Sequence, residues 1–393
     1  MSSEAVVIVA AKRSPLGAFQ GTLSGASSPD LAAAAIRACI EASALDSAAI
    51  SEVLLGCVLP AGVGQAPARQ AAIQAGIPLG ASCTTLNKVC GSGMKATMLG
   101  SDLIKAGSAG IVVSGGMESM SNAPYLMPKA RAGYRLGHQQ ILDHMFFDGL
   151  QNPSDGNMMG YFAEETAKKY SFSREAQDAF AIESVARARS AMAEGVFDAE
   201  IAPVTISGRK GDVTVSEDEG PGLANLEKIP TLRPAFAKDG TVTAASSSSI
   251  SDGAAALILM HASDAEKHGL EPLATIKGHS SFAHEPEWFT TAPVFAIKAL
   301  HEKLGWNPDN VDLYEINEAF ACVTMAAMVD VGLDHGKVNV NGGACALGHP
   351  IGATGARIIV TLLHALRNRN LKRGMATLCI GGGEAVAIGI EVN

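Results

Sequence analysis

The stretch Gly110-Ile111-Val112-Val113-Ser114-Gly115-Gly116-Met117-Glu118 decides the fold, because its pattern returns near the C-terminus as Met375-Ala376-Thr377-Leu378-Cys379-Ile380-Gly381-Gly382-Gly383-Glu384. Both stretches begin with a short apolar run, which predicts a buried strand, and both end in glycines followed by glutamate. A pattern that recurs at two distant places indicates an internal duplication.

The segments before the two stretches also follow one order. In the first half the residues predict strands at 5–10, 50–56 and 110–114 and helices at 30–42, 66–75 and 94–106; in the second half they predict strands at 273–278, 311–317 and 375–380 and helices at 293–304, 318–331 and 353–368. Strands that alternate with helices predict an α/β protein with doubly wound sheets.

A long insertion separates the two halves. Residues 122–156 hold prolines, glycines, methionines and aromatic residues without clear periodicity, and they are too many for a plain connection. A long amphipathic helix at 174–195 and a strand pair around Gly208-Arg209-Lys210-Gly211-Asp212 follow. We therefore predict a first half at 1–120 plus 246–271, an inserted loop domain at 121–245, and a second half at 272–393.

Cys90 is a candidate nucleophile. It lies in Asn87-Lys88-Val89-Cys90-Gly91-Ser92-Gly93-Met94, between a predicted strand and a predicted helix. The free N–H groups and the positive dipole end of a helix stabilise a thiolate, whose free thiol has a pKa of about 8.5. The plain alternative is a buried, inert cysteine, a common state for this residue type.

His349 is the candidate base for Cys90. It lies in Gly348-His349-Pro350-Ile351-Gly352-Ala353-Thr354-Gly355, directly before a predicted helix, and the duplication makes it the equivalent of Cys90. If the two halves pack face to face, the starts of the equivalent helices meet near the pseudo-twofold axis. That arrangement predicts contact between thiol and imidazole; the alternative for His349 is a solvated loop histidine.

Two further positions carry chemistry. Cys379 ends a strand beside glycines with bare N–H groups, and Asn317-Glu318-Ala319-Phe320 places polar side chains at the end of an apolar strand. Taken alone, Cys379 is compatible with an inert thiol and Asn317 with helix capping. Two thiols, an imidazole, an amide and exposed N–H groups together suit acyl transfer through a thioester, which needs neither a metal nor a redox cofactor.

Composition excludes several classes of function. The net charge of −9 and the isoelectric point near 5.6 provide no basic surface for nucleic acid or for an anionic membrane. No apolar run approaches the roughly 20 residues that span a bilayer. The seven cysteines show no zinc spacing, and their odd number without a signal peptide indicates a reducing cytoplasm.

With these residues, the chain resembles the thiolases over nearly its whole length, and among them the acetyl-CoA acetyltransferases. The motifs that carry the resemblance are Asn-Lys-Val-Cys-Gly-Ser-Gly, Asn-Glu-Ala-Phe, Gly-His-Pro-Ile-Gly-Ala-Thr-Gly and Cys-Ile-Gly-Gly-Gly. The resemblance implies a five-layered α-β-α-β-α core from two duplicated halves. It also implies that the inserted loop domain holds coenzyme A and contributes oligomer contacts, with residues 121–150 in a homotetramer built as a dimer of dimers.

The resemblance also implies catalytic roles. Cys90 takes the acyl group after His349 accepts its proton, and Cys379 removes a proton from the second acetyl-CoA. His349 with a water on Asn317 forms one oxyanion hole, and the N–H groups of Cys90 and Gly381 form the other. Glu318 orients its surroundings. The substrates are coenzyme A and acyl-CoA, with no permanently bound cofactor, and the implied contacts with coenzyme A are Ala235, Phe236, Ala244, Ser248, Phe320 and Met158.

Several positions depart from the best-known synthetic thiolases. Met158 stands where those have histidine, a serine run occupies 246–249, Cys345 replaces the common isoleucine, and 219–222 with Lys228 differ near the nucleotide end of coenzyme A. These departures leave the acyl-chain length open. The expected activity is reversible condensation of two acetyl-CoA to acetoacetyl-CoA, and the alternative is a broad-chain 3-ketoacyl-CoA thiolase of fatty-acid breakdown.

Three other interpretations fit less well. A ketoacyl synthase requires a second histidine where Asn317 and Glu318 stand, and lacks Cys379. A silent acyl-CoA or lipid carrier on the same fold predicts the loss of a catalytic position, and none is lost. A redox-sensing thiol protein predicts a resolving cysteine near Cys90, and neither Cys83 nor Cys379 has a known redox spacing.

Overall fold

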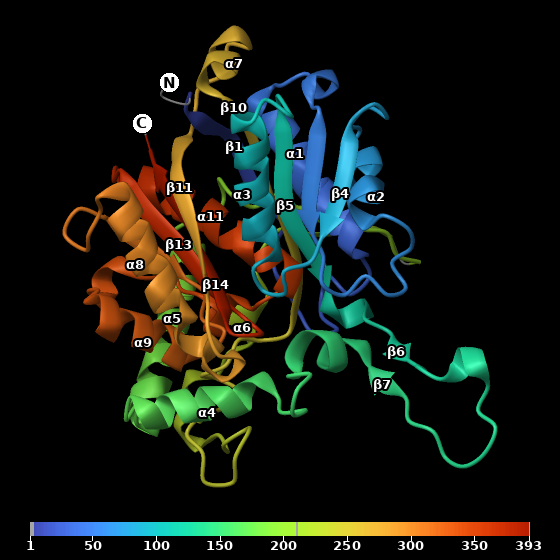
Figure 1. The fold of residues 1–393 in the computed structure, drawn as a ribbon, viewed down its shortest axis with the longest axis vertical. Coiled ribbons are helices and arrows are strands. Elements are labelled where there is room, and N and C mark those ends of the chain that lie inside the picture. The colour runs from blue at the N-terminus through green and yellow to red at the C-terminus, as the bar shows by residue number, and fades with distance from the viewer. Residues whose placement is uncertain (1–3, 210, 393) are drawn as a thin grey trace.

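Ten strands form one mixed sheet in the computed structural model, which describes residues 4–209 and 211–392 (Figure 1). In spatial order the strands are β12 (Leu313–Ile316), β13 (Arg373–Ile380), β14 (Glu384–Glu391), β11 (Ala274–Ala283), β1 (Val6–Arg13), β10 (Ser251–His261), β5 (Val112–Ser119), β3 (Glu52–Gly56) and β4 (Ser82–Leu86), and β2 (Gly17–Ala18) pairs with β10. The sheet therefore passes through both halves of the chain.

The pairing of the strands repeats between the halves. Strand β5 lies between a parallel partner, β3, and an antiparallel partner, β10, and β13 lies in the same way between β12 and β14. The two halves join where β1 pairs with β11, through Val7 with Thr275 and Ile8 with Ala274. This repetition of strand order is the duplication that the sequence predicts.

The sequence prediction missed strand β14. It placed no strand after Glu384, whereas the chain reverses there and runs back along β13 as far as Glu391. Gly382 and Gly383 make the reversal, with φ angles of 95° and 89° that favour glycine. Strand β14 is apolar on both faces because helices cover it, so it lacks the alternation that marks a half-buried strand.

Helices cover the sheet in three layers, which makes five layers with the two half-sheets (Figure 1). Helices α1 (Ser28–Ser43) and α2 (Pro67–Gln74) cover the outer face of the first half, α8 (Ala292–Leu304) and α9 (Ala321–Val331) cover that of the second half, and α3 (Ser92–Lys105) and α11 (Ile351–Asn368) lie between. Helix α11 is buried at every position from Ile351 to Leu363, as a helix enclosed by both half-sheets must be.

Helix α1 shows how local sequence begins an element. Ser27 caps it, its hydroxyl accepting the N–H of Asp30 while the Asp30 carboxylate accepts the N–H of Ser27. Asp30 also places a negative charge in the first turn, where the helix dipole favours it. The helix then buries its alanine-rich face against β10 and β1.

The insertion combines two helices of ordinary length with several short elements. These are β6 (Tyr125–Leu126), β7 (Leu142–Asp143), α4 (Met159–Lys169), α5 (Arg174–Ala193), β8 (Val204–Ile206), β9 (Val213–Val215) and α6 (Gly220–Leu223), while α7 (Ala262–Lys267) and α10 (Ala344–Leu347) lie outside it. The predicted strand pair is β8 with β9, and Lys210 of its turn lies outside the described residues. Strands β6 and β7 begin an arm that projects from the molecule (Figure 1). Across residues 4–209 and 211–392, none of the helices combines the length and the apolar character of a membrane span.

The two central helices touch through glycines. A Cβ atom on Gly355 of α11 would lie 2.4 Å from the backbone nitrogen of Met94 in α3, and one on Gly93 would lie 2.7 Å from that of Ala356. A Cβ on Gly116 of β5 would lie 2.0 Å from the carbonyl oxygen of Gly352. Backbone therefore packs on backbone, and this contact brings the starts of α3 and α11 together.

The contact predicts the effect of one added methyl group. Gly355→Ala should lower the free energy of unfolding by about 1–3 kcal/mol, because neither helix can yield without moving its strands. Gly110→Ala is the matched control, since a Cβ there meets nothing within 4 Å. Urea unfolding followed by circular dichroism measures both; equal stability of the two variants would contradict the close contact.

Candidate active site

A strained turn carries Cys90 from β4 into α3. Val89 has a φ of 46°, an unfavourable conformation for a β-branched residue that costs on the order of 1–3 kcal/mol. Three hydrogen bonds hold it: Val89 N–H donates to Asn87 Oδ1 (2.8 Å), Ser92 Oγ donates to the Val89 carbonyl (2.7 Å), and Lys88 N–H donates to Ser92 Oγ (2.8 Å). The turn therefore presents Cys90 in one fixed orientation.

The environment of the Cys90 thiol differs from the expectation of a stabilised thiolate. Burial raises the pKa of the Cys90 thiol to about 11, although hydrogen bonds from the N–H groups of Gly381 and of Cys90 itself lower it. The prediction that the helix start favours the thiolate was thus wrong in its net effect, because loss of water outweighs two N–H groups. At neutral pH the thiol keeps its proton, so a base is required.

His349 has the protonation state of a base. The Thr354 hydroxyl donates its one proton to the Pro350 carbonyl (2.9 Å), so it must accept the proton of His349 Nδ1, 2.6 Å away. The Nε2 atom is then an unprotonated acceptor; it is buried and has no partner within the described residues. Burial, with the positive charge of Arg357, lowers the pKa of His349 to about 3, so the imidazole is neutral.

Asn317 and Cys379 lie at the ends of neighbouring strands. The backbone N–H of Asn317 donates to the Thr377 carbonyl (3.0 Å), which fixes the end of β12 on β13. Both polar atoms of the Asn317 side chain are buried without a partner in the part of the chain that the structure describes, so the amide is free to bind water or substrate. Cys379 is fully buried, and burial together with the nearby Cys90 and Cys322 thiols raises its pKa.

Glu318 follows Asn317 and is fixed by hydrogen bonds to three other segments. Its carboxylate accepts hydrogen bonds from Ser184 Oγ (2.7 Å), Asn339 Nδ2 (2.8 Å) and the N–H of Cys345 (3.0 Å). These partners come from the insertion and from the second half. Glu318 therefore ties the insertion to the strand end that carries Asn317.

A cavity of about 370 Å³ opens beside His349. The residues predicted to contact coenzyme A that line it are Met158, Ala235, Phe236, Ser248 and Phe320. Ala244 lies instead in a cavity of about 340 Å³ that also contains Lys228, and Ser249 lines both cavities. The sequence did not predict the apolar lining by Met120, Phe146, Leu150 and Ile351. For Phe146 and Leu150, the apolar residues of the irregular segment 122–156 were a signal.

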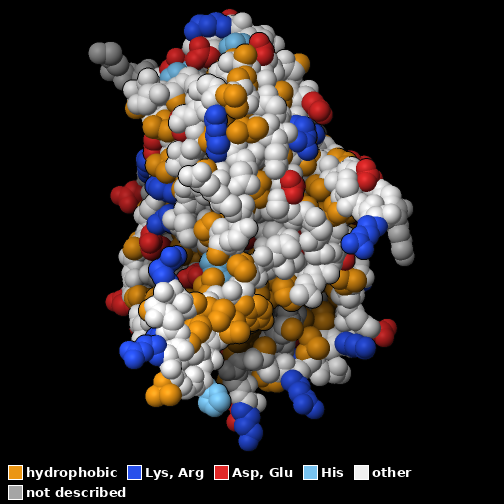
Figure 2. Space-filling model, turned by 90° about the vertical axis from the view of Figure 1, so that its right-hand side faces the viewer, with side chains coloured by type: hydrophobic (Ala, Val, Ile, Leu, Met, Phe, Trp, Pro, Cys, Tyr) orange, Lys and Arg blue, Asp and Glu red, His pale blue; other side chains and the backbone are white. Residues whose placement is uncertain are grey.

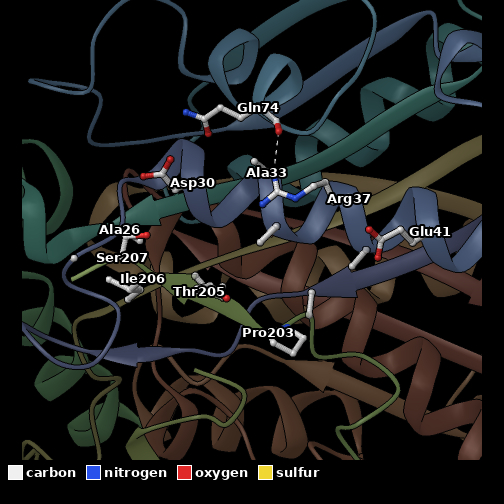
Figure 3. Close-up of a pocket in the computed structure, with 15 residues that line it drawn as sticks. Ala26, Asp30, Ala33, Arg37, Glu41, Gln74, Pro203, Thr205, Ile206 and Ser207 are labelled. Carbon is white, nitrogen blue, oxygen red and sulfur yellow. Dashed lines mark hydrogen bonds between the residues drawn. The ribbon is translucent and has the colours of Figure 1, made fainter. Parts of the chain in front are cut away.

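A larger cavity lies elsewhere. It has a volume of about 760 Å³ and lies between α1 and residues 202–207, where Arg37 donates to the Gln74 carbonyl (2.8 Å; Figure 3). None of the predicted site residues lines it. The chemistry of the side chains, and not the size of the hollow, therefore identifies the candidate active site.

A thiol, a neutral imidazole and a second thiol at the junction of two duplicated α/β halves define the class of cysteine-dependent acyl-transferring enzymes. Residues 6–263 match the family described as thiolase, N-terminal domain, and residues 270–392 match thiolase, C-terminal domain. The chain belongs to the thiolase family.

Similar proteins match this chain over nearly its whole length. It is 49% identical over 385 residues to the acetyl-CoA acetyltransferase of Pseudomonas aeruginosa, covering 98% of each, and 48% identical over 387 residues to that of Escherichia coli, again covering 98% of each. Among solved structures it is similar to Acat5 thiolase from Ascaris suum in complex with coenzyme A (43% identity, TM-score 0.94, 99% of this chain and 100% of that one). The acetyl-CoA acetyltransferase of Bacillus anthracis is also similar (41% identity, TM-score 0.97, 100% and 99%).

Because the Cys90 thiol is protonated at neutral pH, its rate of alkylation should depend on pH. Alkylation of Cys90 by iodoacetamide in the free protein should accelerate roughly tenfold per pH unit from about pH 7 to about pH 9, because only the thiolate reacts. Mass spectrometry of the Cys90 peptide measures the rate, and Cys90→Ala protein corrects for other thiols. A rate that is already level at neutral pH would instead indicate a preformed thiolate–imidazolium pair.

Proposed function

We propose that this chain catalyses the reversible condensation of two acetyl-CoA molecules to acetoacetyl-CoA and coenzyme A. The observation that carries the proposal is the similarity, over nearly the full length of both chains, to proteins named acetyl-CoA acetyltransferase. The partly buried Cys90 thiol and the buried His349 imidazole supply the chemistry that this reaction needs. No permanently bound cofactor takes part in the proposed steps.

The first step transfers an acetyl group to Cys90. His349 Nε2 accepts the thiol proton while the sulfur attacks the thioester carbon, and the N–H groups of Cys90 and Gly381 stabilise the oxyanion. The bond from carbon to the sulfur of coenzyme A then breaks, and the proton passes from His349 to the departing thiolate. The raised pKa of Cys90 and the lowered pKa of His349 support a transfer of the proton during the attack.

The second step forms the carbon–carbon bond. Cys379 gives its thiol proton to His349 and takes a proton from the α-carbon of a second acetyl-CoA, while His349 with a water on the Asn317 amide stabilises the enolate oxygen. The α-carbon attacks the acetyl carbon on Cys90, whose thiolate leaves and recovers a proton from His349. Thiolysis follows the same steps in reverse. The free polar atoms of Asn317 and of His349 Nε2 support these roles.

Coenzyme A occupies the cavity beside His349 in this proposal. The pantetheine arm contacts Ser248 and Phe320 and passes between Met158, Ala235 and Phe236, all of which line that cavity. Ala244 lies further out, in the cavity that contains Lys228. The similar Ascaris suum thiolase was solved in complex with coenzyme A, which supports this assignment.

A broader range of acyl chains is the second candidate function. Met120, Phe146, Leu150 and Met158 give the cavity an apolar lining, which suits an acyl chain longer than acetyl. A 3-ketoacyl-CoA thiolase of fatty-acid breakdown would use such a lining.

We also propose that the protein is a cytoplasmic homotetramer, a dimer of dimers. The inserted loop domain, residues 121–245, provides contacts with coenzyme A and between subunits. The arm between β6 and β7 exposes large apolar side chains, among them Tyr125, Met127, Leu136 and Ile141, and Figure 2 shows apolar side chains gathered on the lower half of this side of the molecule. Apolar surface of this kind is typical of subunit contacts.

The two thiols should separate the two half-reactions. Cys90→Ala should lower both condensation and thiolysis by at least about a thousandfold, because the acyl acceptor is lost. Cys379→Ala should still accept acetyl from acetyl-CoA on Cys90, seen as added mass on the intact protein, but should not condense. Cys83→Ala is the control and should be active. Failure of Cys379→Ala to become acylated would assign Cys379 to the first step.

The acyl-chain range decides between the two candidate functions. Steady-state thiolysis of 3-ketoacyl-CoA substrates from about four to about sixteen carbons should show the highest kcat/KM with acetoacetyl-CoA, by roughly tenfold or more. Comparable rates on long chains would make the protein a broad 3-ketoacyl-CoA thiolase. Met158→Ala enlarges the cavity and should raise the relative rate on longer chains.

A further inference from the structure

The glutamate that ends each of the repeated stretches contacts the opposite half of the chain. Glu118 of the first half accepts N–H groups from Val58 (2.9 Å) and Leu59 (3.0 Å), and from Gly352 (2.8 Å) at the start of α11. Glu384 of the second half forms an ion pair with Lys88, two residues before Cys90. The repeated glycine–glutamate pattern is therefore a pair of reciprocal contacts between the halves.

The contact of Glu384 lies at the place where the two donors of the Cys90 oxyanion hole meet. One donor, Cys90 N–H, belongs to the first half, and the other, Gly381 N–H, belongs to the second. The two loops pack closely, since a Cβ on Gly91 would lie 2.4 Å from Ile380 Cδ1. The distance between the donors thus depends on how two separate loops are held together.

The first loop is held by its own hydrogen bonds, whereas the second loop has little packing at Gly381. The second loop is Gly381-Gly382-Gly383, and a Cβ at Gly381 would meet only Met159 Sδ at 3.6 Å and Val89 Cγ1 at 3.7 Å. The first loop contains Val89 in its strained conformation. Three consecutive glycines lose much conformational entropy on ordering, so an external contact has a large effect on where the Gly381 N–H lies.

We infer that the Lys88–Glu384 ion pair is a positioning pair that sets the oxyanion hole of Cys90 and Gly381. Lys88 extends from the strained turn before Cys90, and Glu384 is the first residue after the glycine turn, so the pair joins the two loops by their side chains. Its side chains are 23% and 35% exposed, so the pair adds little to global stability. Its effect is on geometry, because a donor must lie within a few tenths of an ångström of the oxyanion. This inference depends on the proposed function of Cys90 and Gly381.

The test compares the two ends of strand β14. Glu384→Gln and Lys88→Met should each lower kcat for thiolysis of acetoacetyl-CoA roughly tenfold, with KM changed less than about twofold, because a displaced donor weakens transition-state binding alone. Glu391→Gln is the matched control: it removes ion pairs with Lys277 and Arg373 at the other end of β14 and should leave kcat unchanged. The single-turnover rate of Cys90 acetylation should fall in parallel with kcat.

Combining the two substitutions distinguishes a role of the ion pair in placing the N–H donors from a general loss of structure. The double variant Lys88→Met with Glu384→Gln should be no slower than either single variant, and exchanging the charges, Lys88→Glu with Glu384→Lys, should restore at least part of kcat. Equal kcat in Glu384→Gln and Glu391→Gln, or additive losses in the double variant, would overturn the inference. Absence of acetylated Cys90 in the unaltered protein would instead overturn the proposed function.

Discussion

The contact of backbone on backbone between α3 and α11 is the constraint on which the rest of the structure depends. Gly93 and Gly355 allow the two helices to approach until no side chain fits between them, and Gly116 brings β5 equally close to the start of α11. Because Cys90 and His349 lie just before the starts of α3 and α11, the separation of the helices sets the separation of these two residues. The layers outside hold this contact in place by burying apolar surface on both faces of the sheet.

Exclusion of water is the second property of the site. In water, a cysteine at the start of a helix beside a histidine would tend toward a thiolate and an imidazolium. Here burial raises the pKa of Cys90 and lowers that of His349, so both groups are neutral. The hydroxyl of Thr354 completes this state by fixing which nitrogen of His349 carries the proton. In the proposed mechanism the nucleophile is therefore formed only when a substrate carbonyl is present to take up its charge.

Much of this arrangement could be predicted from sequence, because local patterns and a repeated order carry it. The duplication indicated which helix starts are equivalent, and short motifs marked Cys90, His349, Asn317 and Cys379. What could not be predicted depends on contacts between distant segments. The pKa of Cys90 reflects its burial in the folded chain, and the apolar lining at Phe146 and Leu150 comes from an irregular insertion. Strand β14 lacks alternation because both of its faces are covered.

Since the proposed nucleophile and its proposed base belong to different halves, the order of synthesis has a consequence. Cys90 leaves the ribosome more than 250 residues before His349, and Gly381 follows later still. Until the second half has folded against the first, Cys90 has neither its proposed base nor the proposed second N–H donor, and it is an ordinary thiol. The growing chain therefore cannot consume acyl-CoA or capture stray electrophiles by this mechanism, and reactivity arises together with the completed pseudo-twofold interface.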